Sequence, residues 1–416
     1  MVVRSTRALA ALLLSCAVLP TSAAGQSADE VRALWVVRTS LTSPSSVEAI
    51  VRTARDHGFN TVLVQVRGRG DAYFNGGVDP RAAALALQPA SFDPLQALIA
   101  SAHAEGLRVH AWVNVNLVAS ANDLPASRQH IVYRHPEWLM VPRDLAEQLA
   151  TIEPDTPTYL GRLSRWTREH ADAVQGLYLS PLTPGAAEYT AEVLDDLAAR
   201  YPVDGVHLDY IRFPDDRFDF SRSAMEELRA DVRPRLPGEE RLRMDARASV
   251  RPTVYADRYP ERWTALRRSR LTSLLMRLRT VVKRRRPDAI FSAALVPDEA
   301  DALALRFQDW RTWLEGGLLD VACPMAYTQD PAVFESQIAA IREIATSNGL
   351  WAGIGAYRLS PGQTIVNIRA ARRHRADGIV LFSYDSLTDP AQHGADYLAQ
   401  VAEAAFGVNT VTAGSR

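Results

Sequence analysis

Polar and aromatic residues recur in this sequence at the ends of short apolar runs. The richest case is segment 204–214, where His207 and Asp209 alternate with apolar residues and Tyr210 and Arg212 follow. Alternate residues of a strand share one face, and polar side chains are out of place inside a buried strand. The ends of these runs are therefore the first places to look for chemistry. The other runs contribute Gln65, Arg67 and Asp71; Trp112 and Asn114; Asp298 and Glu299; and Tyr327, Tyr357 and Tyr384.

These residue types together suit a carbohydrate site. Aromatic faces stack on the C–H surfaces of sugars, amides and arginines bind hydroxyl groups, and a pair of carboxylates performs the acid and base steps of glycosidic hydrolysis. Other hydrolytic chemistries find less support. The nine histidines form no H-x-H or H-E-x-x-H pattern for zinc, and no G-x-S-x-G provides a serine nucleophile. We therefore expect no metal and no cofactor, and a glycan as the partner.

Eight apolar runs predict buried strands, because their length, β-branched content and flanking Gly or Pro favour strand over helix. They span residues 31–37, 61–66, 107–113, 203–208, 289–296, 319–325, 350–354 and 378–382. Amphipathic segments between them predict helices at 46–57, 93–105, 187–201, 263–285, 331–347 and 363–374. This alternation predicts an α/β fold, a closed (β/α)8 TIM-type barrel. A doubly wound open sheet is the alternative, but no G-x-G-x-x-G follows the first strand.

Two connections are much longer than the others. Segments 117–185 and 213–262, rich in Pro and charge, extend the βα loops after strands three and four, at the end of a barrel where active sites lie. The many arginines of 263–285 fit a solvated helix face better than a nucleic-acid surface, because no aromatic residues interleave with them. The net charge of −1 over 416 residues also argues against nucleic-acid binding. No linker interrupts 31–406, which we expect to form one domain between a short tail at 25–30 and a C-terminal tail at 407–416.

The first 24 residues have the pattern of a signal peptide. Arg4 and Arg7 precede an apolar run at 8–19, and Ser22-Ala23-Ala24 provides a small-residue cleavage site. A lipoprotein signal ending at Cys16 is the less favoured alternative. Cleavage near Ala24 would leave an exported chain, periplasmic or extracellular, with a single cysteine and no intramolecular disulfide. No later apolar stretch approaches 18 residues, so no transmembrane segment is expected in the mature chain.

The motifs together resemble a known family, the bacterial glycosyl-hydrolase-like family 10. The resemblance extends from about residue 31 to about residue 400, and its most specific part is the D-G-x-H-x-D-Y segment. The matching residues are Arg32-Ala33-Leu34-Trp35-Val36, Gly58-Phe59-Asn60-Thr61-Val62, Gln65-Val66-Arg67, Gly70-Asp71-Ala72, His110-Ala111-Trp112-Val113-Asn114, His135-Pro136-Glu137-Trp138, Asp204-Gly205-Val206-His207-Leu208-Asp209-Tyr210, Met325-Ala326-Tyr327 and Gly355-Ala356-Tyr357-Arg358.

The resemblance implies a TIM-type barrel and activity on glycosidic bonds of extracellular or cell-wall glycans, peptidoglycan included. It also implies that Asp209 is the catalytic carboxylate. The sequence departs from the family in two places. Many members have Asp-Asp-Tyr where this chain has Asp209-Tyr210, and often Asn-Pro or Asp-Pro where it has Ser180-Pro181. These departures concern the second carboxylate more than the fold.

We expect Asp209 to be ionised beside Arg67 or Arg212, because a nearby cation favours the carboxylate form. It would be the nucleophile of a retaining mechanism or the base of an inverting one. A second carboxyl must protonate the leaving oxygen, and the candidates, in order, are Asp298, Glu299 and Asp71. Asp298 and Glu299 also fit a helix N-terminus, and Asp71 also fits a turn.

Contacts with substrate are expected from the amides, arginines and aromatic residues near the same strand ends. His207 lies one layer deeper and also suits a hydrogen bond to Asp209 or to a neighbouring strand. Because only one catalytic carboxylate is well supported, a non-catalytic sugar-binding barrel is the main alternative to a glycoside hydrolase. A barrel lyase or deacetylase is a third, although a deacetylase needs a metal cluster. The expected contacts are Gln65, Arg67, Trp112, Asn114, Trp138, His207, Tyr210, Arg212, Tyr327, Tyr357 and Tyr384.

Overall fold

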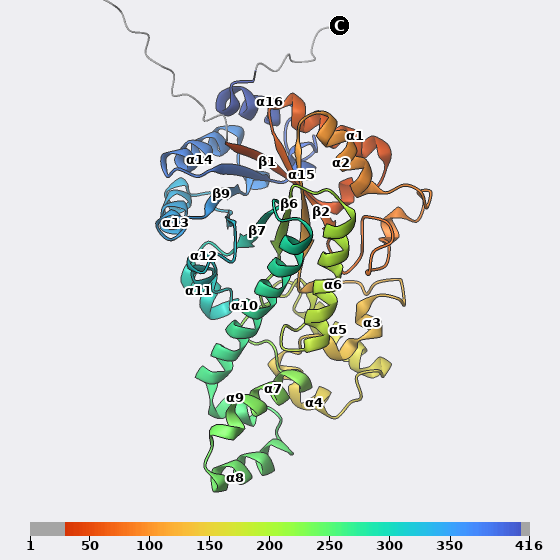
Figure 1. Cartoon of the computed structure of the whole chain (residues 1–416), viewed down its shortest axis with the longest axis vertical. Coiled ribbons are helices and arrows are strands. Elements are labelled where there is room, and N and C mark those ends of the chain that lie inside the picture. Colours follow the sequence, from red (N-terminus) through yellow and green to blue (C-terminus); the bar gives the residue numbers. More distant parts are fainter. Residues whose placement is uncertain (1–29, 409–416) are drawn as a thin grey trace, which may run out of the picture. The chain divides into compact units, whose positions relative to one another are not determined.

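The computed structural model describes residues 30–408, so the predicted signal peptide and most of the predicted C-terminal tail lie outside the described residues. Eight parallel strands close into a barrel in the order β1-β10-β9-β8-β7-β6-β3-β2 (Figure 1). The sheet has no edge, because β1 pairs with both β10 and β2. The predicted (β/α)8 barrel is confirmed, and the open sheet is excluded. The strands are β1 Val31–Val36, β2 Thr61–Arg67, β3 Arg108–Asn114, β6 Gly205–Asp209, β7 Ile290–Leu295, β8 Val321–Ala326, β9 Gly349–Ile354 and β10 Gly378–Phe382.

The side chains on the two faces of each barrel strand pack in two different cores. Side chains such as Leu34, Val64 and Leu208 point outward and pack in the core shared with the helices. Leu208 is fully buried there, as its position between His207 and Asp209 predicts. A second core fills the barrel interior with alternate residues of the same strands. It consists of Val31, Ala33, Trp35, Leu63, Trp112, Val321, Cys323, Trp351 and Val380.

The helices begin where the sequence combines a capping side chain with a proline. Ser43 precedes Pro44 of α1 and accepts a hydrogen bond from the backbone N–H of Ser46, and Asp330 caps α13 in the same way. A capping oxygen satisfies a free N–H of the first turn, and Pro at the first position loses no hydrogen bond. The barrel helices are α1 Pro44–Asp56, α2 Pro94–Ala104, α6 Pro184–Arg200, α10 Pro260–Arg285, α11 Glu299–Leu305, α12 Trp310–Glu315, α13 Pro331–Ile344, α14 Pro361–Arg373, α15 Tyr384–Leu387 and α16 Tyr397–Val401.

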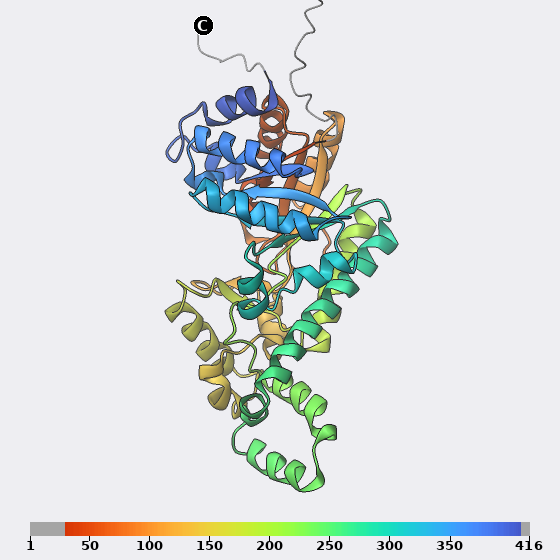
Figure 2. The ribbon, with the colours of Figure 1, turned by 90° about the vertical axis from the view of Figure 1, so that its left-hand side faces the viewer.

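The two long connections carry the additional elements. Between β3 and β6 the chain forms a two-stranded antiparallel sheet of β4 (Leu117–Ser120) and β5 (Gly176–Tyr178), which the sequence did not predict. The connection also contains α3 (Ile131–Arg134), α4 (Ala146–Ala150) and α5 (Pro157–Glu169). After β6, helices α7 (Arg222–Val232), α8 (Gly238–Ala248) and α9 (Val254–Arg258) lie at the end of α10 that points away from the barrel (Figures 1 and 2). Both connections leave the carboxyl ends of strands.

The basic face of α10 is balanced by acidic residues of neighbouring elements. Arg270 pairs with Glu227, and Arg279 and Lys283 both pair with Asp320. Such pairing is typical of a solvated helix face. Across residues 30–408, no helix is both long enough and apolar enough to cross a bilayer.

Candidate active site

A cavity of about 230 Å³ lies at the carboxyl ends of the barrel strands. We call it the mouth cavity. It is lined from β1, β2, β3, β6, β7, β8 and β10, so almost the whole barrel contributes to it. Its lining residues are Trp35, Val37, Arg38, Gln65, Arg69, Trp112, Asn114, Leu117, Asp209, Tyr210, Arg212, Ala294, Met325, Tyr327 and Phe382. The structure therefore brings together seven of the predicted site residues: Gln65, Trp112, Asn114, Asp209, Tyr210, Arg212 and Tyr327.

Asp209 is the last residue of β6 and is 7% exposed. Its Oδ1 accepts two hydrogen bonds, one from the backbone N–H of Tyr210 at 2.6 Å and one from Nη1 of Arg212 at 2.8 Å. Its Oδ2 accepts none from the described residues. One oxygen is therefore fixed in position while the other is available in a cavity that a substrate could enter. The predicted cation is Arg212 rather than Arg67.

The backbone of Tyr210 is unusual, since its φ of 52° lies in the left-handed region. A bulky residue in this region costs about 1–3 kcal/mol, and such outliers concentrate at functional sites. The guanidinium of Arg212 lies 4.1 Å from the centre of the Tyr210 ring. Burial disfavours the charge of Arg212, but Asp209, Tyr210 and Tyr178 together outweigh burial, and the pKa of Arg212 is raised. Burial also raises the pKa of Tyr210, so its phenol stays protonated at neutral pH.

A chain of hydrogen bonds through side-chain amides holds the wall of the mouth cavity next to Asp209. Nη1 of Arg38 donates to Oε1 of Gln65 at 2.8 Å, and Nε2 of Gln65 donates to Oδ1 of Asn114 at 3.3 Å. Oδ1 of Asn114 also accepts from Nε1 of Trp112 at 3.1 Å, and its Nδ2 donates to the carbonyl of Gly68 at 2.8 Å. Because Asn114 is paired in register with Asp209 across β3 and β6, this network lies directly beside the carboxylate.

Aromatic rings form the rest of the wall. The ring of Trp35 meets those of Tyr327 and Phe382 edge-on, with centroids 6.2 and 6.0 Å apart, and Tyr327 stacks on Phe382 at 5.5 Å. Gly353 makes room for Trp35, since a Cβ at that position would lie 2.8 Å from the indole. Burial raises the pKa of Tyr327 well above its usual value, so this phenol also keeps its proton. The cavity thus combines apolar faces with hydrogen-bond donors.

Arg67 is not in the mouth cavity, which corrects the expectation that it contacts substrate. Its side chain is fully buried, and its Nε donates to Oδ2 of Asp79 at 2.6 Å. Nη1 donates to the carbonyls of Asn114 and Val115 at the end of β3. Tyr189 donates its hydroxyl to the other oxygen of Asp79. Arg67 therefore ties the ends of two strands together from inside the protein.

His207 also lies below the cavity, and the expectation of substrate contact is corrected here too. It is fully buried, and its Nδ1 lies 2.9 Å from Oγ of Ser292 on the neighbouring strand β7. Burial lowers its pKa to about 3, and burial, aided by His207, lowers that of His110 to about 3. Both imidazoles are therefore neutral parts of the barrel interior. Neither can exchange protons with a substrate in the mouth cavity.

The three candidates for the second carboxyl do not line the mouth cavity. Asp298 is exposed and caps α11 by accepting from the N–H of Asp301 at 2.9 Å. Glu299 forms a two-pronged ion pair with Arg311, which lowers its pKa. Asp71 is closer, because its Oδ1 accepts a hydrogen bond at 3.0 Å from the backbone of the lining residue Arg69. Of the three, the structure brings only Asp71 next to the cavity.

The three remaining aromatic candidates lie around the cavity or away from it. Tyr357 meets Tyr327 edge-on at 6.2 Å and extends the aromatic wall outward. Trp138 stacks on His135 at 3.8 Å in the connection between β3 and β6 and does not line the cavity. Tyr384 opens α15 and is buried. The expectation of substrate contact is therefore corrected for Tyr384, which packs as a core residue.

Comparison with known proteins agrees with this arrangement. The profile of the family described as glycosyl hydrolase-like 10 matches residues 30–366. The chain belongs to this family. Within the matched region lie Asp209 and every residue of the mouth cavity except Phe382.

Two named relatives are similar to this chain at low sequence identity. Glycosyl hydrolase DigH of Escherichia coli K12 is 25% identical over 370 residues, covering 77% of this chain and 73% of DigH. Glycosyl hydrolase YngK of Bacillus subtilis is 23% identical over 213 residues, covering 47% of this chain and 36% of YngK.

Solved structures show the same fold. The glycoside hydrolase domain of PgaB (BpsB) from Bordetella bronchiseptica superposes with a TM-score of 0.59 at 16% identity, covering 89% of this chain and 99% of that domain. A beta-galactosidase from Bacillus circulans sp. alkalophilus also gives a TM-score of 0.59, at 13% identity, covering 91% of this chain and 56% of the enzyme.

Four prominent residues of the mouth cavity were not among the predicted site residues: Trp35, Arg38, Arg69 and Phe382. Trp35 lies near the end of the first strand, and Phe382 ends the last one. The rule that revealed the other candidates, polar or aromatic residues at strand ends, applies to these two positions as well. Arg38 and Arg69 each come two residues after a strand, in loops that the fold turns towards the cavity.

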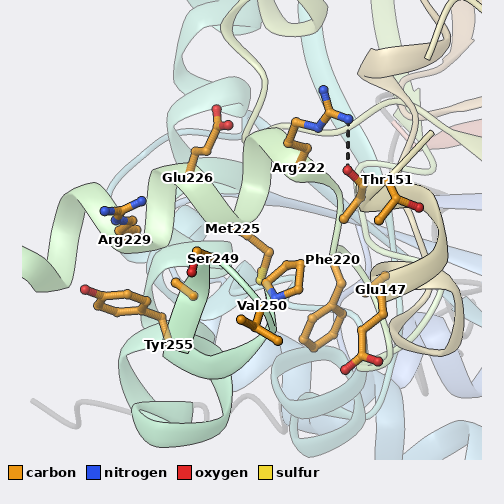
Figure 3. Close-up of a pocket in the computed structure, with 14 residues that line it drawn as sticks. Glu147, Thr151, Phe220, Arg222, Met225, Glu226, Arg229, Ser249, Val250 and Tyr255 are labelled. Atoms are coloured by element: carbon orange, nitrogen blue, oxygen red, sulfur yellow. Dashed lines mark hydrogen bonds between the residues drawn. The ribbon is translucent and has the colours of Figure 1, made fainter. Parts of the chain in front are cut away.

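A second cavity, of about 290 Å³, lies among the helices α4, α7 and α9 (Figure 3). Its lining mixes apolar residues such as Phe220 and Met225 with the charged Glu147, Arg222 and Glu226. None of the residues predicted from the strand ends contributes to it. Within residues 30–408, no group of three or more His, Cys, Asp or Glu side chains is arranged to hold a metal ion.

Proposed function

We propose that this protein is an exported glycoside hydrolase that cleaves glycosidic bonds of an extracellular or cell-wall polysaccharide, for which peptidoglycan glycan is one candidate. The observation that carries the proposal is Asp209. It belongs to the D-G-x-H-x-D-Y motif, lies at the carboxyl end of a barrel strand, and keeps one carboxylate oxygen free in the mouth cavity. Active sites of (β/α)8 enzymes lie at this end of the barrel.

The environment of Asp209 supports a role as nucleophile or base. Arg212 and the N–H of Tyr210 both bind Oδ1, which fixes the position of the carboxylate. The unpartnered Oδ2 is then the reacting atom. In a retaining reaction it attacks the anomeric carbon, and in an inverting reaction it takes a proton from the attacking water.

We assign the proton donor to Asp71. A glycosidic leaving oxygen must be protonated as the bond breaks, and the donor must reach the cavity. Asp298 caps a helix and Glu299 is held by Arg311, so both have structural roles away from the cavity. Oδ1 of Asp71 accepts a hydrogen bond from the backbone N–H of Arg69, which lines the cavity.

The walls of the cavity support a sugar ligand. The faces of Trp112, Tyr327 and Phe382 offer surfaces for C–H groups, while Gln65 and Asn114 offer amides for hydroxyls. Export is supported by the sequence pattern of residues 1–24, with cleavage near Ala24.

A non-catalytic sugar-binding barrel is the alternative function. It is favoured by one observation, that Asp209 is the single carboxylate among the residues that line the mouth cavity. A protein of this kind would bind the same glycans and release no product.

The test is release of reducing ends from a panel of purified peptidoglycan glycans and neutral and acidic polysaccharides. Asp209→Asn keeps the shape and both hydrogen bonds to Oδ1 and removes the charge, so turnover should fall roughly 10²–10⁴-fold while glycan binding persists. Asp71→Asn should also lose most turnover.

Asp298→Asn is the matched control, since Asn caps a helix as well as Asp, and it should retain wild-type turnover and stability. Hydrolysis by Asp209→Asn at the wild-type rate would refute the assignment of Asp209. Glycan binding by the wild type with no product from any member of the panel would establish the sugar-binding alternative.

A further inference from the structure

The charges that line the mouth cavity do not balance. Three arginines, Arg38, Arg69 and Arg212, face one carboxylate, Asp209. Asp209 is engaged by Arg212 at 2.8 Å. Among residues 30–408, neither Arg38 nor Arg69 forms an ion pair, so the lining keeps a surplus of two positive charges. Arg285, by contrast, is neutralised by an ion pair with Asp195.

The two unpaired arginines are held in place by neutral acceptors. Nη1 of Arg38 donates to Gln65, and Nη1 of Arg69 donates to the carbonyls of Gln175 at 3.2 Å and Ala119 at 3.4 Å. Gly68 allows Arg38 to pass close to the backbone, because a Cβ there would lie 2.5 Å from Cδ of Arg38. A guanidinium has five N–H donors, so both groups keep donors for a ligand.

Two other carboxylates near this part of the chain, Asp71 and Asp385, accept hydrogen bonds from groups other than the two guanidiniums. Oδ1 of Asp71 accepts from the backbone N–H of Arg69. Asp385 accepts from the backbone of Val37 and from the hydroxyls of Thr39 and Ser40. Neither forms an ion pair with Arg38 or Arg69 in the described part of the chain. Burial and, less strongly, the charge of Arg38 lower the pKa of Arg69, and the charge of Asp71 opposes them only in part. Both guanidinium side chains line the same cavity.

Two like charges in one cavity repel each other, and an anion bound between them offsets this repulsion. We propose that Arg38 and Arg69 form a subsite for a carboxylate carried by a sugar ring, so that the substrate is an acidic glycan. This rests on the proposed function, because it places the carboxylate on the sugar that enters the mouth cavity. A carboxylate is planar and has two oxygens, which suits the planar donor fork of arginine, and Trp112 and Tyr327 lie in the same cavity to stack on the ring.

The experiment compares two ligands that differ only at carbon 6. Methyl glucuronide carries a carboxylate where methyl glucoside carries a hydroxymethyl group. Binding of each to the full chain is measured by ligand-observed NMR titration, which requires no turnover. The glucuronide should bind at least about tenfold more tightly, the factor expected for one charge-assisted contact. Equal affinity for the two glycosides would overturn the proposal.

Variants test whether the two arginines carry this preference. Arg38→Gln and Arg69→Gln should each remove most of the preference, measured as the ratio of the affinities for methyl glucuronide and methyl glucoside in the same variant. Both should fold, since removing one of two like charges leaves no carboxylate unpaired. Gly68→Ala keeps every charge but displaces Arg38, and should weaken the preference as Arg38→Gln does. Arg284→Gln, on the exposed face of α10, is the matched control and should bind like the wild type.

Further results separate the carboxylate subsite from a sulfate site, from other residues as its cause, and from the hydrolase proposal. Tighter binding of glucose 6-sulfate than of methyl glucuronide would overturn the assignment of a carboxylate. An unchanged preference in both arginine variants would overturn the assignment of the residues. If the preference holds while no glycan is hydrolysed, the subsite stands and the hydrolase proposal fails. If neutral glycans are hydrolysed and the preference is absent, the hydrolase proposal stands and the subsite fails.

Discussion

The buried pair Arg67–Asp79 allows a stringent test of the distinction between a structural and a substrate-binding arginine. Both side chains are fully buried and are joined by a hydrogen bond of 2.6 Å. We consider three variants: Arg67→Met, which keeps most of the volume and removes the charge, Asp79→Asn, and the double variant. If Arg67 serves the fold alone, all three should act on stability and not on affinity for glycans.

The loss in the free energy of unfolding that we expect for each variant depends on which buried groups the substitution leaves without a partner. Asp79→Asn leaves a buried guanidinium without its counter-charge, and such a loss costs about 3–5 kcal/mol. Arg67→Met leaves the carboxylate with Tyr189 as its remaining partner and frees the carbonyls of Asn114 and Val115, so its cost should be at least as large. In the double variant no buried charge is left unpaired. Its cost should therefore fall short of the sum by about 3 kcal/mol.

Urea unfolding followed by circular dichroism measures these free energies, with the slope against urea checked for constancy. The affinity of the folded variants for methyl glucuronide should equal that of the wild type. The reasoning is refuted if Arg67→Met unfolds at the urea concentration of the wild type, or if its stability is intact and its affinity for the ligand is lost.

The remaining predictions concern the barrel wall, its interior and the N-terminus. Leu208→Ala should lower the free energy of unfolding by about 2–5 kcal/mol, because Leu208 is fully buried between strand and helices; urea unfolding measures this loss, and a change below 1 kcal/mol would contradict the packing. His110 and His207 have pKa values of about 3 in the fold, below the 6.5 of the unfolded chain. The unfolded state therefore binds more protons below pH 6.5, and stability should fall from pH 6.5 towards pH 3 by up to about 1.4 kcal/mol per pH unit for each histidine. His207→Asn should halve this slope in urea titrations, and a flat profile would show that the imidazoles are not held neutral. Mass spectrometry of the exported protein should find an N-terminus just after Ala24, whereas an acylated terminus would indicate a lipoprotein.

The barrel itself could be predicted from the sequence, for a local reason. A strand buried on both faces reads as a short apolar run, and eight such runs separated by amphipathic segments have few arrangements other than a closed barrel. The same alternation predicted that Leu208 would point outward and Asp209 inward, since side chains along a strand change face at every residue. Asp209, Asn114 and Trp112 reached the mouth cavity because they lie on inward positions at strand ends.

Which side chain each charged residue pairs with became clear only from the tertiary structure. Arg67 and Arg212 looked equivalent as cations for Asp209, and only the folded chain shows Arg67 bonded to Asp79 and Arg212 bonded to Asp209. Arg212 is only three residues from Asp209, but the choice between Arg67 and Arg212 depended on Asp79, whose pairing with Arg67 no strand or helix period encodes. The short strands β4 and β5 were missed for the same reason, because each is too short to show a period of its own and forms only by pairing with the other.

The second catalytic carboxyl could not be identified from the sequence. Asp298 and Glu299 follow β7 in the sequence, just as Asp209 ends β6, but α11 begins at once and uses Asp298 as its cap. A position directly after a strand therefore predicted a cavity residue only where the following residues continue towards the mouth cavity. The unpaired charges of Arg38 and Arg69 became visible only when the fold placed two distant loops beside one carboxylate, because a charge balance within a cavity is a property of three-dimensional neighbours.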